Sequence, residues 1–279
     1  MPIIALSPCF SKFDKPDGHK DQHRFMLLPS LDFFLAAIPA VLLVGLSKGG
    51  LGGALALMGV PLMALVVSPV QAAAIFLPIL IAMDIVALWA WRKFNDRKTL
   101  LMILPGGIVG IALGWATSAM VSADALRIVI AIATILFALR YFQQTYLTPA
   151  ERETPPLPHR PVAAGFWGML SGYASFVAHA GGPPFQIYVL PMRLDPRRYT
   201  GASVRFFALV NAVKVIPYFA LGAFDSENLT ASATLMPVAF VATMAGAALV
   251  RRMKVEIFYP LMYALALAAG LKLLWDGLM

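Results

Sequence analysis

The chain has 279 residues, of which 60% are hydrophobic and only 13% are charged. A soluble domain averages about 45–50% apolar and about 25% charged residues, so this composition excludes a soluble enzyme, a disordered tail, a coiled coil and a disulfide scaffold. It indicates an all-α, polytopic integral membrane protein. The net charge of +8 favours basic cytoplasmic loops over a nucleic-acid partner.

The first thirty residues lack the basic-then-apolar pattern of a cleavable signal. They carry four prolines and scattered charges instead. We interpret residues 1–30 as a mobile N-terminal tail and expect the mature membrane part to begin at Leu31. Cys9 is the only cysteine, so the sequence offers neither an internal disulfide nor a CxxC motif.

The first predicted repeat covers residues 31–142. It begins with an apolar run, 31–67, that is interrupted at residues 47–53 by the sequence SKGGLGG. A spanning helix needs about 20 apolar residues. Three further segments approach this length, and we predict spans at 70–91, 100–120 and 125–142. A linker rich in proline and charge follows at 143–161.

The second predicted repeat covers residues 162–279 and follows the same plan. Its first apolar run is interrupted at residues 179–184, with the sequence HAGGPP. An offset of 130 residues superimposes Gly52 on Gly182 and Pro61 on Pro191. Such a repeated unit is typical of transporters built from two related halves. The remaining predicted elements are the apolar run 162–190 and the spans 200–224, 231–250 and 257–274.

The distribution of lysine and arginine predicts the orientation of the chain. Basic residues concentrate at 92–98, in the linker, at 193–198 and at 251–254, and these segments are therefore expected in the cytoplasm. The second broken run would then start and end on the cytoplasmic side, as a re-entrant hairpin does. By analogy the first broken run is also a hairpin, which makes the two repeats inverted and places both termini outside.

The two glycine-rich breaks are the first candidate for a binding site. Non-helical backbone at membrane depth must be shielded by protein or line a water-filled cavity. A helix N-terminus at each tip would attract an anion. The alternative is a hairpin whose glycines serve only close helix packing. The candidate glycines are Gly49, Gly50, Gly52, Gly53, Gly181 and Gly182.

Five polar side chains within the apolar runs are the second candidate. Lys48 adjoins the first tip and would neutralise a substrate anion, or else form an internal salt bridge. His179 precedes the second tip. It would donate a hydrogen bond to an anion, sense protons near neutral pH, or donate a hydrogen bond within the protein. Asp84 and Lys214 correspond under the offset of 130, so we expect either an ion pair that fixes packing or a role in coupling. Asn211 lies one turn before Lys214 and would share its site.

Two further residues complete the candidate set. We expect Gln186 to line the same cavity, about one turn after the second tip, and Arg205 to lie near the cytoplasmic mouth. The chain contains no HExxH, GxSxG, Walker or EF-hand motif. We therefore predict no enzyme activity, no cofactor and no metal site.

Several of these segments together resemble one known family. The segments are SKGGLGG (47–53) followed by Val60-Pro61, SFVAHAGGPPFQ (175–186), and FFA (206–208) followed by PYFALG (217–222). They resemble the sulfite exporter TauE/SafE family from about residue 31 to residue 274. The resemblance implies a small bacterial inner-membrane carrier without an ATPase domain, associated with sulfite, sulfoacetate, other organosulfonates and other small anions.

The sequence thus leads to one main hypothesis and two alternatives. The main hypothesis is a secondary transporter that moves a small anion across the bacterial inner membrane by alternating access. The alternatives are an anion channel and an accessory membrane subunit without transport activity. The expected partners are a small anionic substrate and the lipid bilayer, with a homodimer left open.

Overall fold

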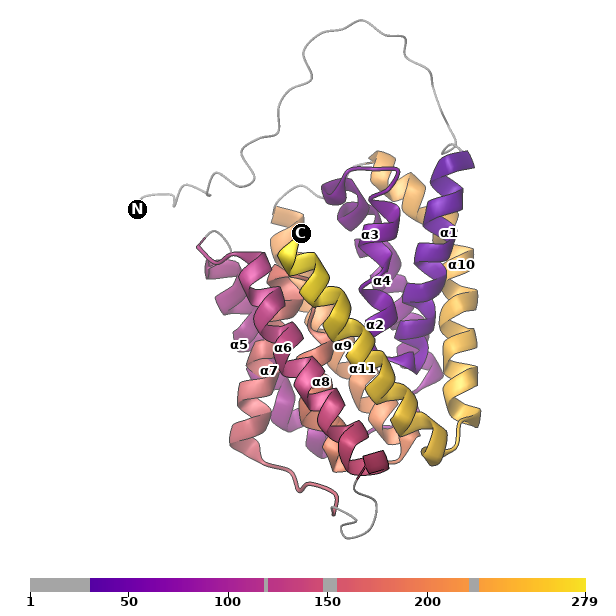
Figure 1. Cartoon of the computed structure of the whole chain (residues 1–279). Coiled ribbons are helices and arrows are strands. Elements are labelled where there is room, and N and C mark those ends of the chain that lie inside the picture. The colour runs from indigo at the N-terminus through magenta and orange to yellow at the C-terminus, as the bar shows by residue number, and fades with distance from the viewer. Residues whose placement is uncertain (1–30, 118–119, 148–154, 221–225) are drawn as a thin grey trace, which may run out of the picture.

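The computed structural model describes residues 31–117, 120–147, 155–220 and 226–279, and this part of the chain forms helices without any strand (Figure 1). The predicted tail at 1–30 lies outside the described residues. The elements are α1 (Leu31–Leu46), the π-helical turn η1 (Ser47–Leu51), α2 (Gly53–Ala56), α3 (Gly59–Met63), α4 (Pro69–Ala90), α5 (Arg97–Thr117), α6 (Ala123–Phe142), the π-helical turn η2 (Gln143–Leu147), α7 (Pro161–Val177), α8 (Gly182–Val189), the 3-10 turn η3 (Leu190–Met192), α9 (Pro196–Ala220), α10 (Ser226–Arg252) and α11 (Val255–Leu278).

Five helical stretches of the described chain are long and apolar enough to cross a membrane. They are Leu31–Leu51, Arg97–Thr117, Ala123–Leu147, Asn228–Arg252 and Val255–Leu278. The predicted all-helical, multi-pass membrane protein is thereby confirmed. The helical conformation after α6 continues through η2, five residues into the predicted linker.

Helices from distant parts of the sequence pack against one another. α10 packs against α1 and α4, and their apolar side chains form one core that includes Phe33, Phe76 and Leu235. α5 packs against α7 and α9, and α6 packs against α11. A second and larger core joins these helices around Phe185, Phe206 and Phe258. The outer surface carries exposed apolar side chains, as a lipid solvent requires.

The helices that lead to the two glycine-rich breaks start at different ends of the bundle. Figure 1 shows α1 starting at the upper end, where α3 also lies, whereas α7 starts at the lower end. In the first break Gly50 and Gly52 have φ of +140° and +83°, which favour glycine because it lacks a Cβ atom. In the second break His179 has a left-handed φ of +53°, and α8 begins three residues later.

The contact between α5 and α7 is a close approach of two backbones. A Cβ atom added at Gly110 would lie 2.0 Å from the carbonyl oxygen of Met169. One added at Gly172 would lie 2.0 Å from the carbonyl oxygen of Gly107. Small residues at helix interfaces permit such packing in membranes, where no hydrophobic force drives helices together. Glycine is therefore required at these positions.

We expect Gly172→Ala to destabilise the protein by about 1–3 kcal/mol, the usual effect of overpacking. The added methyl group would overlap a backbone carbonyl, so α5 and α7 would have to separate. The midpoint of thermal unfolding in detergent measures the effect. Gly165→Ala, on the same helix, is the matched control because a Cβ atom there meets nothing within 4 Å. Equal midpoints for the two variants would contradict the packing argument.

Candidate functional site

A cavity of about 140 Å³ lies where the two glycine-rich breaks meet α4 and α9, and we call it the tip cavity. Its volume equals roughly four or five water molecules at about 30 Å³ each. It suits a small ion, because pockets for drug-sized ligands measure about 300–1,000 Å³. Most of the sequence-predicted site residues line it: Lys48, Gly50, Gly52, Gly53, Asp84, His179, Gly181, Gly182, Asn211 and Lys214.

The tips of the two breaks touch at one wall of the tip cavity. A Cβ atom added at Gly53 would lie 3.0 Å from the Cα atom of Gly182, and one added at Gly182 would lie 3.1 Å from that of Gly53. Serine hydroxyls hold the irregular backbone on both sides. Ser47 donates a hydrogen bond to the carbonyl of Gly52, and Ser171 donates one of 2.6 Å to that of Gly181. These bonds satisfy carbonyls that the breaks remove from the helices.

Asp84 is the shared acceptor of two donors in the tip cavity. Lys48 Nζ donates to Asp84 Oδ1 at 2.6 Å, and Asn211 Nδ2 donates to Asp84 Oδ2 at 2.6 Å. The Asp84 carboxylate is buried, and a buried charge needs such partners. The Asp84–Lys214 ion pair, one of the two alternatives for these residues, is therefore not formed, and Lys48 instead makes the internal salt bridge that was one of its alternatives. The Lys48–Asp84 ion pair joins η1 to α4, and the hydrogen bond from the Asn211 amide joins α9 to the same carboxylate.

Lys214 is bound differently. Its side chain is 3% exposed, and Nζ donates to the carbonyl oxygen of Ser175 at 2.8 Å and to the hydroxyl of Ser175 at 3.3 Å. Ser175 lies in the last turn of α7, where the helix dipole favours a cation. Within the described ranges Lys214 forms no ion pair with a carboxylate.

The charged side chains give the tip cavity a net positive charge. Among the described lining residues Lys48 and Lys214 outnumber Asp84, which leaves one positive charge when both lysines are protonated and His179 is neutral. His179 also lines the tip cavity, where its ring can donate or accept a hydrogen bond. An anion entering this space gains the attraction of Lys214 without first breaking a salt bridge.

The helix N-termini contribute less than the sequence suggested. The first turn of α8 is Gly182-Pro183-Pro184. Proline fits the first turn of a helix but has no amide hydrogen, so Gly182 supplies the only N–H donor of that turn. α2 contains only four residues. Most of the positive charge therefore comes from side chains rather than from backbone amides.

Three sequence-predicted residues, Gly49, Gln186 and Arg205, do not line the tip cavity. The carbonyl of Gly49 accepts a hydrogen bond of 2.9 Å from Trp91 Nε1, and a Cβ atom at Gly49 would collide with α10. Gln186 is 2% exposed and lies behind the first break, since a Cβ atom at Gly52 would sit 2.8 Å from Gln186 Nε2. Gly49 and Gln186 support the wall of the tip cavity from outside.

Arg205 holds the loop between α4 and α5. Its guanidinium donates hydrogen bonds to the carbonyl oxygens of Phe94 at 2.6 Å, Gly201 at 2.8 Å, and Trp91 and Arg92 at 3.2 Å each. Because these acceptors lie at the loop or within α9, Arg205 fastens α9 to the loop. It does not reach the tip cavity.

The sequence-based search missed Ser175, which supplies both acceptors for Lys214. Ser175 begins the SFVAHAGGPPFQ segment and lies four residues before His179, about one helical turn away. That spacing places Ser175 beside the second break, but a serine in an apolar run does not indicate that Lys214 is its hydrogen-bond partner. Ser203 and Phe207, on α9, are two further lining residues that the search missed.

Apolar spans around a small, positively charged cavity between two helix breaks define a multi-pass membrane protein of the transporter class. The chain belongs to the sulfite exporter TauE/SafE family, because the model of that family, described as Sulfite exporter TauE/SafE, matches residues 37–273. The resemblance seen in the sequence is thus confirmed. Searches of curated proteins and of solved structures gave no match.

Proposed function

We propose that the protein is a secondary transporter for a small anion, namely sulfite or an organosulfonate such as sulfoacetate, in the bacterial inner membrane. The observation that carries this proposal is Lys214, a buried cation at the tip cavity whose bonds within the described part of the chain go to the carbonyl and hydroxyl of Ser175. Intramembrane cations mark ion pathways because they are expensive to bury. The tip cavity has room for an anion of a few non-hydrogen atoms.

The proposed mechanism is alternating access between two inverted repeats, each with a re-entrant hairpin and three spans. The pairing of helices supports it. Under the offset of 130 residues, α5 corresponds to α10 and α7 to α1, and α5 packs against α7 as α10 packs against α1. α4 pairs with its equivalent α9, and α6 pairs with its equivalent α11. In such transporters one group of helices moves against the other around a fixed site.

In this proposal each polar group of the tip cavity has a role. Lys214 attracts the anion, and His179 and the Gly182 amide donate hydrogen bonds to its oxygen atoms. The Lys48–Asp84 pair holds η1 against α4, so that the first tip keeps its contact with the second. Movement of one hairpin tip away from the other would open the tip cavity.

Flux through the purified protein in liposomes tests the proposal. We expect saturable uptake of radiolabelled sulfite or sulfoacetate that exceeds the uptake of protein-free liposomes and is competed by the unlabelled anion. Absence of flux for all small anions, with a protein that unfolds cooperatively, would refute transport. Electrical conductance far above carrier rates would instead establish a channel. Co-purification of a stoichiometric second protein, together with absence of flux, would indicate an accessory subunit.

A further inference from the structure

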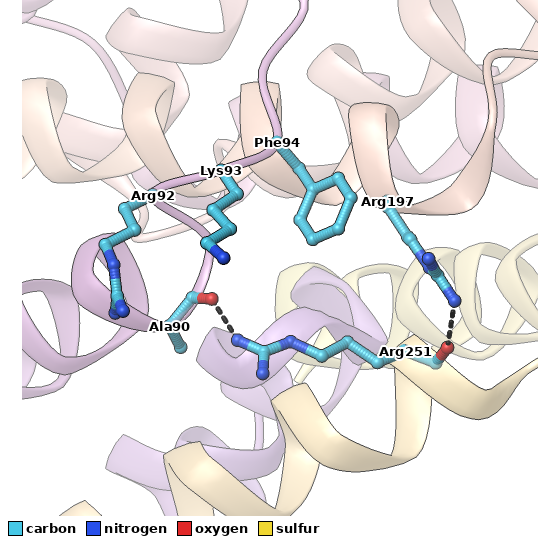
Figure 2. A pocket seen from close by; sticks show the side chains of 6 residues that line it. All are labelled: Ala90, Arg92, Lys93, Phe94, Arg197 and Arg251. Carbon is cyan, nitrogen blue, oxygen red and sulfur yellow. Dashed lines mark hydrogen bonds between the residues drawn. The ribbon is translucent and has the colours of Figure 1, made fainter.

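A second cavity, of about 350 Å³, lies where the ends of α4 and α10 meet the start of α9, and we call it the basic pocket. Figure 2 shows its six lining residues, which come from the end of α4 and the following loop, from α9 and from α10. Four of them are cations. Among the described residues no acidic side chain lines the basic pocket. The lining residues are Ala90, Arg92, Lys93, Phe94, Arg197 and Arg251.

The two arginines from α9 and α10 are held in place by the protein. Arg251 donates a hydrogen bond to the carbonyl of Ala90, and its guanidinium lies 5.3 Å from the ring centre of Trp91. Arg197 donates to the carbonyl of Arg251 at 3.1 Å and lies 5.5 Å from the ring centre of Phe94 (Figure 2). A preorganised cation loses less entropy when it binds a ligand.

The charge of the basic pocket is not compensated by the described part of the protein. None of the four cations forms an ion pair there, and Arg251 Nε is buried without an acceptor. The nearby carboxylate of Asp195 accepts from the backbone N–H of Arg197 at 3.0 Å instead. Like charges held together repel one another, so an anion that bridges them would stabilise this end of the protein.

The surroundings of the basic pocket place it at the level of lipid headgroups. Trp89, one residue before the first lining residue, is 58% exposed, and the Arg92 guanidinium lies 4.8 Å from its ring centre. Exposed aromatic residues mark the membrane–water interface. Leu249 and Val255, which flank Arg251 in sequence, are 49% and 48% exposed. An apolar, lipid-facing surface therefore ends at the rim of the basic pocket.

We propose that the basic pocket binds a phosphate group, supplied by the headgroup of an anionic phospholipid. Arginine side chains match phosphate oxygens with pairs of parallel hydrogen bonds, and basic pockets between transmembrane helices suit anionic headgroups. The phosphate would bridge the loop after α4 to α9 and α10. A soluble phosphate has the same oxygen atoms, and the experiment separates the two sources. The site is independent of which anion the tip cavity transports.

Thermal unfolding of the full-length protein in neutral detergent tests this site, since a ligand of the folded state raises the midpoint. We expect phosphatidylglycerol to raise the midpoint, and phosphatidylcholine at the same concentration to leave it unchanged. The double variant Arg92→Gln/Lys93→Gln should bind phosphatidylglycerol on the order of tenfold more weakly. Both side chains are exposed, so the variant retains the packed interior.

The matched control is Arg198→Gln/Arg252→Gln, which removes two exposed cations from the same end of the bundle but outside the basic pocket. This control should keep the full shift. An equal rise with inorganic phosphate at the same concentration would support the site and assign it to soluble phosphate. Equal loss of the shift in both double variants, or absence of a shift with either ligand, would overturn the proposal.

Discussion

Replacing Asp84 with alanine is expected to abolish anion transport and to lower the free energy of unfolding by about 3–5 kcal/mol, the usual effect of removing one partner of a buried ion pair. The substitution leaves the Lys48 ammonium and the Asn211 amide without their acceptor in a buried site. The first break would then lose its link to α4 and α9. Thermal unfolding in detergent and flux in liposomes measure the two effects.

A double variant separates stability from transport. Lys48→Met/Asp84→Leu removes both charges, and replacing a whole buried ion pair by apolar side chains is often neutral for stability. We expect the double variant to unfold near the wild-type midpoint but to remain inactive. Asp124→Ala is the matched control, because its ion pair with Arg127 is exposed and contributes at most about 1 kcal/mol. Wild-type flux through the double variant would contradict a role for the pair in transport.

The membrane spans were predictable because lipid restricts composition along a whole helix. Every backbone group inside a bilayer must be satisfied within a helix, and the apolar runs that were predicted as spans coincide with the helices α4, α5, α6, α9, α10 and α11. Of these, α5, α6, α10 and α11 lie in stretches that are long and apolar enough to cross a membrane. The ends of helices were less predictable. α5 begins at Arg97, three residues before the predicted span, because charged residues at a helix end can extend beyond the apolar layer.

The candidate site was predictable as a set of residues but not as a set of contacts. Asp84 and Lys214, which correspond under the offset of 130 residues, both line the tip cavity, because the equivalent helices α4 and α9 pack together. The offset did not identify their bonds. Lys48, on the π-helical turn η1, reaches Asp84 on α4 at 2.6 Å, whereas the described ion pairs include none between Lys214 and Asp84. Such a choice depends on backbone geometry that no residue pattern encodes.

The identity of these bonds decides which cation faces the substrate. Had Asp84 paired with Lys214, Lys48 would be the cation available to an anion. With the observed pairing, Lys48 is neutralised, and Lys214 is bound, among the described residues, by the carbonyl and hydroxyl of Ser175 rather than by a carboxylate. An anion can replace those weaker acceptors more easily than it can displace a carboxylate. The substrate charge is therefore expected to meet Lys214 first.

We accordingly expect Lys214→Met to lower kcat/KM for anion transport by on the order of 100-fold, the effect of removing one partner of a buried charge pair, here the pair of Lys214 with the bound anion. Methionine keeps the apolar stem of the side chain and removes the ammonium. Initial rates of uptake in liposomes over a range of anion concentrations measure the change. Because the tip cavity loses its net positive charge, we expect the apparent affinity for the anion to fall together with the maximal rate.

Two further variants make this prediction specific to the ammonium of Lys214. Lys272→Met makes the same substitution on α11, where the lysine pairs with Asp276 outside the tip cavity, and should transport normally. Ser175→Ala removes only the hydroxyl acceptor at 3.3 Å and leaves the carbonyl at 2.8 Å, so it should reduce transport far less than Lys214→Met. Normal transport by Lys214→Met would remove this residue from the site. Equal loss in Ser175→Ala would indicate that the position of the lysine, rather than its charge, limits transport.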